Sequence, residues 1–242
     1  MKTAFVTGSS RGIGRAIAIR LAKDGYHVIL HGTAIDDNVQ NVKRIIEENG
    51  GSTQIMPCEL TDTEKVAEFC KTLPSIDVLV LNASVQYRTS WQDITLDACS
   101  EQLNCNFVSS LLLIQATVEH MKKNRWGRII TIGSVQEEKP HPDMLVYSAS
   151  KAAQTNMVRS LSLQLAAEGI TVNNVAPGVI YTDRNKKALS DKEYAKKVID
   201  SIPLRFFGEP QDIAGIVSLI CSEEGRYITG QSIFVDGGKS VQ

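Results

Sequence analysis

The sequence predicts an α/β fold in which about seven parallel strands form a doubly wound sheet with helices on both faces. Short apolar runs alternate with helical patterns along the whole chain, which is typical of strand–helix–strand units with right-handed crossovers. The run at residues 77–81 is apolar after its first residue, as expected for a parallel strand buried on both faces. The 242 residues contain no repeat and no linker-like stretch, so we expect one domain spanning residues 1–242.

The individual elements follow from local patterns. Strands are expected at residues 4–6, 26–30, 53–56, 77–81, 128–132, 171–175 and 232–235, which are short and mostly rich in apolar or β-branched residues. Helices are expected at residues 15–23, 36–49, 62–73, 97–123, 147–167, 183–201 and 211–221. Gly25 ends the first helix and Gly50 the second, whereas Asp62 or Thr61 can cap the third.

The bulk composition argues against several classes of protein. A net charge of −1 gives no electrostatic footprint for nucleic acid or for an anionic membrane. No apolar run approaches the 18 or so residues of a membrane span, and the start of the chain does not resemble a signal peptide. The five cysteines lack CxxC spacing and the four histidines lack ligand spacing, so we expect no metal site and a cytoplasmic protein with reduced thiols.

A glycine-rich turn joins the first expected strand to the first expected helix. Gly8, Gly12 and Gly14 lie there, with one more residue between the first two than the usual Rossmann fingerprint has. Backbone N–H groups and the N-terminus of a helix favour an anion at such a turn. We therefore expect a dinucleotide pyrophosphate on this loop.

The end of the second expected strand bears on the choice of nicotinamide cofactor. NAD-binding proteins usually place an acid there for the ribose 2′-hydroxyl, but this chain has no acid before Asp36. Arg11, within the glycine loop, can pair with a 2′-phosphate, a charged hydrogen bond worth about 1.5–3 kcal/mol. The sequence thus predicts NADP(H), and the alternative for Arg11 is a solvated loop cation.

Tyr147 and Lys151 are four residues apart, which places both side chains on one face of a helix. A free phenol has a pKa of about 10, whereas general acid–base chemistry favours a value nearer 7. A cation about 4 Å away contributes about 4 kcal/mol at an effective dielectric constant of about 20, which is enough to close that gap. The pair predicts a proton-transfer site; the alternative is a packing tyrosine beside a surface lysine.

Taken together, seven signals in this order resemble the short-chain dehydrogenase/reductase family over nearly the whole chain. They are the glycine loop from Thr7 to Gly14, Asn82-Ala83, Asn106, Ser134, Tyr147 with Lys151, Pro177-Gly178, and Ile228-Thr229-Gly230-Gln231. Two positions depart from the family pattern: Ser84 stands where a glycine is usual, and Glu59 where an aspartate is usual.

The resemblance implies a role for each catalytic candidate. Ser134 would bind the substrate carbonyl oxygen, and Tyr147 would be the general acid of reduction and the base of the reverse reaction. Lys151 would lower the pKa of Tyr147 and bind the nicotinamide ribose, and Asn106 would complete a proton relay through a water molecule. The alternatives are that Ser134 caps a strand end and that Asn106 is a helix residue bonded to backbone.

The resemblance also implies the residues that hold the cofactor. They are Gly8, Ser10, Arg11, Gly12, Ile13, Gly14, Thr33, Glu59, Leu60, Asn82, Ala83, Ser84, Tyr147, Lys151, Pro177, Gly178, Val179 and Thr182. Asn82 and the Pro177-Gly178 pair have an alternative explanation as turn formers. Family members further suggest a homotetramer built on the helices at 97–123 and 147–167.

Within the family the chain looks most like the 3-oxoacyl-acyl-carrier-protein reductases of fatty acid biosynthesis, which implies NADPH-dependent reduction of 3-oxoacyl thioesters. Arg128 matches one basic position that docks the acidic carrier protein in those enzymes, but Glu168 occupies the other and would repel it. Residues 183–203 would form a substrate lid whose many charges, Arg184 among them, would form a mostly solvated face. The alternatives are a reductase or dehydrogenase for another small ketone or alcohol, such as a sugar or a steroid-like compound, and a catalytically idle dinucleotide sensor.

Overall fold

The computed structural model describes residues 1–242, except for the side chain of Lys187. Seven strands form one parallel sheet in the order β3-β2-β1-β4-β5-β6-β7. The strands are β1 (Thr3–Val6), β2 (His27–Leu30), β3 (Ser52–Ile55), β4 (Val78–Leu81), β5 (Gly127–Ile132), β6 (Ile170–Pro177) and β7 (Ser232–Val235). The predicted doubly wound α/β fold is confirmed.

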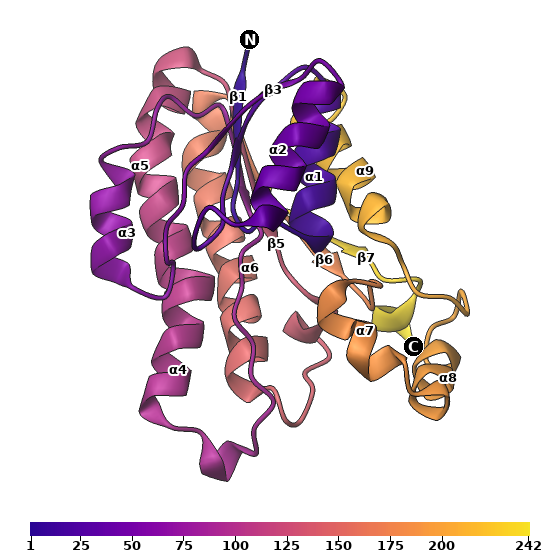
Figure 1. Cartoon of the computed structure of the whole chain (residues 1–242). Helices are drawn as coiled ribbons and strands as arrows, with labels where there is room; N and C mark the ends of the chain where they lie inside the picture. The colour runs from indigo at the N-terminus through magenta and orange to yellow at the C-terminus, as the bar shows by residue number, and fades with distance from the viewer.

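The helices lie in two layers, one on each face of the sheet (Figure 1). One layer contains α1 (Gly12–Lys23), α2 (Asp37–Glu48) and α9 (Pro210–Cys221). The other contains α3 (Thr63–Cys70), α5 (Ser109–Asn124) and α6 (Leu145–Leu165). Asp62 caps α3 by accepting a hydrogen bond from the backbone of Lys65, which decides between the two predicted caps.

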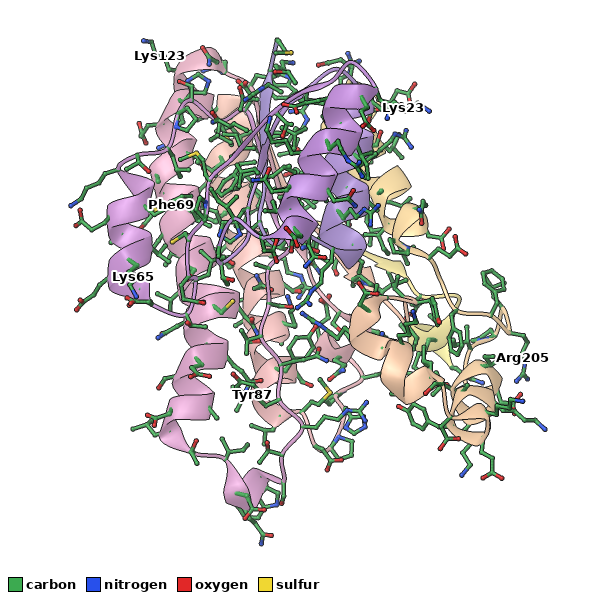
Figure 2. All side chains as sticks on the ribbon, viewed as in Figure 1. Lys23, Lys65, Phe69, Tyr87, Lys123 and Arg205 are labelled. Carbon is green, nitrogen blue, oxygen red and sulfur yellow. The ribbon has the colours of Figure 1, made fainter. Side chains whose placement is uncertain are left out.

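Alternate residues of the central strands enter the two hydrophobic cores, because successive strand side chains point to opposite faces. Val6 of β1 packs with the α1, α2 and α9 layer, whereas its neighbour Phe5 packs with the α3, α5 and α6 layer. All four residues of β4 are buried, as the continuous apolar run predicted. Charged side chains such as Lys23, Lys65 and Lys123 point outward from the helices (Figure 2).

Two expected helices differ from the structure. The helix expected at 97–123 consists of α4 (Leu96–Leu103), a π-helical turn η2 (Asn104–Val108) and α5. The helix expected at 183–201 is two helices, α7 (Asp183–Leu189) and α8 (Lys192–Asp200). Asp191 starts the second of these by accepting hydrogen bonds from the backbone of Glu193 and Tyr194.

Four short 3-10 helices complete the fold: η1 (Trp91–Asp93), η3 (Val135–Glu137), η4 (Ala166–Glu168) and η5 (Lys239–Val241). Among the residues described, no helix is long and apolar enough to cross a membrane.

Candidate active site

A cavity of about 870 Å³ opens at the carboxyl ends of the strands, a volume within the range of about 300–1,000 Å³ common for ligand sites. It lies where the strand order reverses beside β1, the usual place for a ligand in an open α/β sheet. Every predicted cofactor residue lines it, as do Ser134, Tyr147 and Lys151. Asn106 is the one predicted site residue that does not.

The glycine loop has the shape that a diphosphate requires. Gly8 has a φ of +63°, which favours glycine. A Cβ on Gly14 would lie 2.2 Å from the Gly8 carbonyl oxygen, so only glycine fits where α1 meets the loop. Among the described residues no side chain caps the start of α1, which leaves N–H groups of its first turn open to an anion.

Asn82 ties this loop to the end of β4. Its Nδ2 donates to the carbonyl oxygens of Thr7 (2.9 Å) and Gly8 (3.0 Å). The backbone N–H groups of Asn82 and Ala83 donate to the Thr7 hydroxyl in return. Asn82 therefore holds the loop in place in addition to lining the cavity.

Ser84 fits without strain at the position where the family usually has glycine. The only non-glycine residues with positive φ in the described backbone are Arg125 and Arg205, so Ser84 has an ordinary conformation. Its hydroxyl and carbonyl oxygens accept hydrogen bonds from Arg184 of α7, at 3.2 Å and 3.0 Å.

His31, which was not predicted as a site residue, directly follows β2 and contacts the glycine loop. Its Nδ1 accepts a hydrogen bond from the Gly8 N–H at 3.1 Å, and its buried Nε2 has no partner among the described atoms. Burial lowers the pKa of His31 to about 4, so the imidazole is neutral near pH 7. A histidine in place of the acid that NAD enzymes carry near this strand end was the signal that could have identified it.

Arg11 and Thr33 lie at the same end of the cavity. The Asp36 carboxylate, also in the lining, caps α2 by accepting from the Val39 N–H at 2.9 Å. This hydrogen bond lowers the pKa of Asp36 and occupies one of its carboxylate oxygens.

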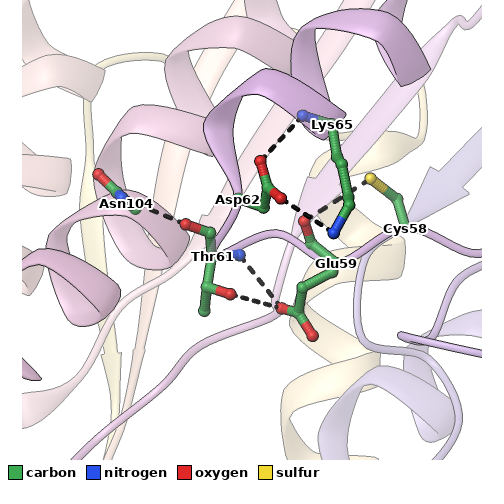
Figure 3. Close-up of polar contacts among 6 residues, drawn as sticks. All are labelled: Cys58, Glu59, Thr61, Asp62, Lys65 and Asn104. Atoms are coloured by element: carbon green, nitrogen blue, oxygen red, sulfur yellow. Dashed lines mark hydrogen bonds and ion pairs between the residues drawn. The ribbon is translucent and has the colours of Figure 1, made fainter. Parts of the chain in front are cut away.

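Glu59 holds the loop after β3 rather than pointing freely into the cavity (Figure 3). Its carboxylate accepts from the Thr61 N–H at 3.2 Å and from the Thr61 hydroxyl at 3.0 Å. The Thr61 carbonyl accepts in turn from the side chain of Asn104, at the start of the π-helical turn. Glu59 thus makes a local contact within the loop beside Leu60.

The predicted proton-transfer residues lie together. Ser134 follows β5 and caps η3, with its Oγ accepting from the Gln136 N–H at 3.2 Å, so the predicted capping alternative also holds. Tyr147 and Lys151 lie one turn apart on α6, and the Tyr147 side chain is hydrogen bonded to Ser134. A carbonyl oxygen beside the two hydroxyls can accept a hydrogen bond from each.

The charge balance at Tyr147 differs from the expectation. The Lys151 Nζ lies 5.7 Å from the centre of the Tyr147 ring and donates to the Ile132 carbonyl (2.7 Å) and to the Gln154 Oε1 (2.9 Å). Burial raises the pKa of Tyr147, and this effect outweighs the lowering by the Arg184 charge and by the Ser134 hydrogen bond. Burial also lowers the pKa of Lys151 to about 8.

Asn106 lies in the π-helical turn and is fully buried. Its Oδ1 accepts from the Val85 N–H, and its Nδ2 donates to the Val85 carbonyl and to the Ser150 hydroxyl, each at 2.9 Å. These bonds tether the segment after β4 to α6, in line with the backbone-bonded alternative. The relay role of Asn106 stays a prediction.

Arg184 is exposed, in line with the expected mostly solvated face of the lid, but it also has specific partners. It lines the cavity and also donates to the Gln86 Oε1 at 3.3 Å, so it bridges α7 and the segment after β4. Its partners are about 100 residues away in sequence, which is why no local pattern could indicate them.

The two positions linked to carrier-protein docking, Arg128 and Glu168, do not line the cavity. Arg128 is 2 % exposed and lies under the Trp126 ring, 4.4 Å from its centre. It is the second residue of β5, about 20 Å along the strand direction from Ser134, near the amino ends of the strands and away from the cavity. Arg128 is therefore not a docking residue at the cavity mouth. Glu168 is paired with Arg125 at 3.3 Å.

No cluster of three or more histidine, cysteine or acidic side chains in the described part of the chain could hold a metal ion.

Fold and cavity together define a Rossmann-like α/β protein with a polar site at the switch point of its sheet. The family model described as enoyl-(acyl carrier protein) reductase matches residues 8–240. The chain belongs to the short-chain dehydrogenase/reductase family and is an oxidoreductase, as the sequence predicted.

Individual relatives differ in their substrates. The chain is 36 % identical over 237 residues to the 3-oxoacyl-[acyl-carrier-protein] reductase FabG of Rickettsia conorii, covering 98 % of this chain and 96 % of the relative. It is 36 % identical to a glucose 1-dehydrogenase of Gluconobacter oxydans, covering 99 % and 92 %. A structure assigned as an NAD(P)-dependent gluconate 5-dehydrogenase of Beutenbergia cavernae, with NADP bound at low occupancy, matches with a TM-score of 0.94 at 33 % identity, covering 100 % and 97 %.

Proposed function

We propose that the protein is an NADP(H)-dependent carbonyl reductase in which Tyr147 is the general acid. One observation carries this proposal: the hydroxyls of Ser134 and Tyr147 are hydrogen bonded in the cavity that the glycine loop lines, with Lys151 one helical turn away. The open N-terminus of α1 and the close approach at Gly14 fit a dinucleotide diphosphate. The NADP in the Beutenbergia cavernae structure supports the same cofactor here.

Each residue of the site has its own role in the reaction. Ser134 and Tyr147 orient the carbonyl by donating hydrogen bonds to its oxygen, and Tyr147 then gives that oxygen its proton. Lys151 carries a positive charge at pH 7 and stabilises the phenolate that remains on Tyr147. When bound, the cofactor supplies the hydride, so the protein contributes position and electrostatics. In alcohol oxidation Tyr147 takes the proton back.

We propose 3-oxoacyl thioesters as one substrate class. The name of the Rickettsia conorii relative supports it. Burial of Arg128 argues that a carrier protein, if it docks, does so through other residues. Sugar-like substrates are the second class, supported by the glucose and gluconate dehydrogenases among the relatives and by the position of Arg184 in the cavity.

We also propose that α7 and α8 form the lid over this site within a single domain. Residues from both helices line the cavity, among them Arg184, Leu189, Tyr194 and Val198. Exposed leucines on α4 and α6, namely Leu96, Leu145 and Leu163, support the expected tetramer built on these helices.

The test is to mix the protein with NADPH and either acetoacetyl-CoA or a panel of ketones, and to follow the absorbance of the reduced nicotinamide. Tyr147→Phe should lower turnover by at least about 100-fold and leave the Kd for NADPH within about twofold. Tyr227→Phe, at a tyrosine that is 98 % exposed, is the matched control and should be as active as the wild type.

Retained activity in Tyr147→Phe would overturn the role of this residue. If the protein binds NADPH but turns over neither ketones nor alcohols, the sensor alternative is favoured.

A further inference from the structure

Two arginines link the lid to the segment that follows β4. Arg184 of α7 donates to the Ser84 hydroxyl and carbonyl and to the Gln86 side chain. Arg88 of the segment itself contacts the Tyr194 hydroxyl of α8, with its Nη2 at 3.5 Å. All of these acceptors are neutral. The two guanidinium groups therefore hold the lid through hydrogen bonds to neutral acceptors, and none of these bonds pairs a guanidinium with a carboxylate.

No carboxylate lies within ion-pair distance of either arginine in the described part of the chain. Asp183 precedes Arg184 in the sequence, but neighbouring residues on a helix do not face each other. Both arginines line the cavity that contains Ser134 and Tyr147. The acid beside the reactive groups, Glu137, is bonded to the Ser134 backbone and to Asn174, so neither arginine has a carboxylate partner in the cavity.

Arg184 is close enough to the reactive groups to affect them electrostatically. Its charge lowers the pKa of Tyr147, and it also lowers the pKa of Lys151. The second effect is unfavourable, because two cations line the same cavity and repel each other. An anion bound by Arg184 would relieve this repulsion and would lie beside the Tyr147 hydroxyl.

We propose that Arg184, together with Arg88, binds a carboxylate of the substrate, so that the preferred substrates are small oxo acids and the corresponding hydroxy acids. This proposal rests on the proposed function and names the substrate class of the same site. A guanidinium presents its N–H groups in a fork that matches a carboxylate, and such charge-assisted hydrogen bonds are roughly twice as strong as neutral ones. A substrate carboxylate would therefore displace the neutral Ser84 and Gln86 acceptors.

The charge on the substrate separates the two candidate classes. In a 3-oxoacyl thioester the carboxyl carbon is bonded to sulfur and carries no charge near the reacting carbonyl, so it offers Arg184 only another neutral acceptor. In a sugar acid or a short oxo acid, the carboxylate lies a few bonds from the carbonyl. Arg88 and Arg184, which lack an acidic partner, therefore favour substrates that carry a carboxylate.

The test compares carbonyl compounds that differ only in this charge. Acetoacetate is paired with methyl acetoacetate, and 5-keto-D-gluconate is paired with L-sorbose, which has a hydroxymethyl group in place of the carboxylate. With NADPH, at least one acid should have a kcat/KM at least about tenfold above that of its neutral partner.

Variants of Arg184 test whether this residue causes the preference for acids. Arg184→Gln should reduce the acid-to-neutral ratio by about 10- to 100-fold, and Arg184→Lys should restore part of it because the point charge remains. Lys196→Gln removes one exposed lid charge outside the cavity lining and is the matched control, with an unchanged ratio. The Kd for NADPH, measured by fluorescence, should change by less than about threefold in Arg184→Gln.

Three outcomes would overturn the inference: equal kcat/KM for acids and neutral partners, a preference for acetoacetyl-CoA over every acid, or an unchanged ratio in Arg184→Gln. A large loss of NADPH affinity in Arg184→Gln would assign the arginine to the cofactor diphosphate instead. Absence of turnover with every carbonyl compound would reject the proposed function itself, which is a different result from turnover without an acid preference.

Discussion

The Lys151 ammonium is held by the side chain of Gln154, whose Oε1 accepts a hydrogen bond from Nζ at 2.9 Å. Gln154 is fully buried, and its Nε2 donates to the Ser110 hydroxyl at 3.1 Å, which fixes the amide with its oxygen toward the lysine. Ser110 lies on α5, so a contact between α5 and α6 orients the lysine beside Tyr147. The chain therefore stabilises the charged form of Lys151 in a site where burial opposes it.

This contact leads to a prediction about the pH profile of ketone reduction. The pKa of Lys151 is about 8 and that of Tyr147 is raised above its ordinary value, so Lys151 is the first of the two to lose its proton as the pH rises. Reduction should lose activity above about pH 8. Gln154→Leu removes an acceptor that favours the ammonium, so this decline in kcat/KM should move about one unit toward lower pH, equivalent to about 1.4 kcal/mol.

Gln164→Leu, at an exposed glutamine on the same helix, is the control and should leave the profile in place. A decline that stays near pH 8 in Gln154→Leu would show that another group limits the reaction at alkaline pH.

The motifs and elements that depend on the spacing of residues along the chain could be predicted from the sequence. The interval from Tyr147 to Lys151 is one helical turn, and the glycines of the first loop stand at a strand–helix junction, so both were visible as patterns. The parallel, doubly wound sheet followed from the alternation of strands and helices together with the handedness of crossovers.

What the sequence could not show depends on contacts between distant segments. Arg184 meets Ser84 across 100 residues, and the π-helical turn at Asn106 places that side chain against Val85. The pKa of Tyr147 also depends on its burial and on groups from several elements. The spacing to Lys151 alone predicted a lowered pKa for the tyrosine, whereas burial raises it.

Arg11 should determine the preference for NADPH over NADH. In the described part of the chain no hydrogen bond or ion pair holds its side chain, and it lines the cavity near Thr33. Arg11→Ala should raise the Kd for NADPH by about tenfold or more, because one charge-assisted hydrogen bond to the 2′-phosphate is lost. The Kd for NADH should change little. Titration of intrinsic fluorescence with each cofactor measures both constants.

Arg15→Ala is the control for Arg11, since it removes a nearby charge, on the first turn of α1, outside the cavity lining. Equal losses for NADPH and NADH in Arg11→Ala would refute an assignment to the 2′-phosphate.

We expect the side chain of Asn106 to hold the segment after β4 in place and to take no part in proton transfer. Asn106→Ala leaves the Val85 N–H and carbonyl without their partners, which should lower the free energy of unfolding by about 2–4 kcal/mol. The pH profile of the remaining activity should keep its shape. Urea denaturation and the profile of kcat/KM are the two measurements.

Asn124→Ala, at an exposed asparagine at the end of α5, should leave stability within about 0.5 kcal/mol of the wild type. If Asn106→Ala were as stable as the wild type but changed the pH profile, its side chain would belong to the relay instead.

His31 should make the stability of the protein depend on pH between about 4 and 6.5. Its pKa in the folded protein is about 4 because burial opposes the charge, whereas the unfolded chain takes up the proton near pH 6.5. Within this window the unfolded state binds more protons, so the free energy of unfolding falls as the pH falls. The full difference of about 2.5 units corresponds to about 3 kcal/mol, present above pH 6.5 and lost by about pH 4.

Carboxylates titrate in the same range, so the contribution of His31 is obtained as a difference between variants. His31→Asn should lose about 3 kcal/mol less than the wild type between pH 7 and pH 4 in urea denaturation, although it is less stable at pH 7 because Gly8 loses its acceptor. His141→Gln, at a side chain that is 37 % exposed, is the matched control and should follow the wild type. Parallel curves for His31→Asn and the wild type would mean that the buried imidazole is protonated without cost, and that the Gly8 N–H does not depend on its neutral form.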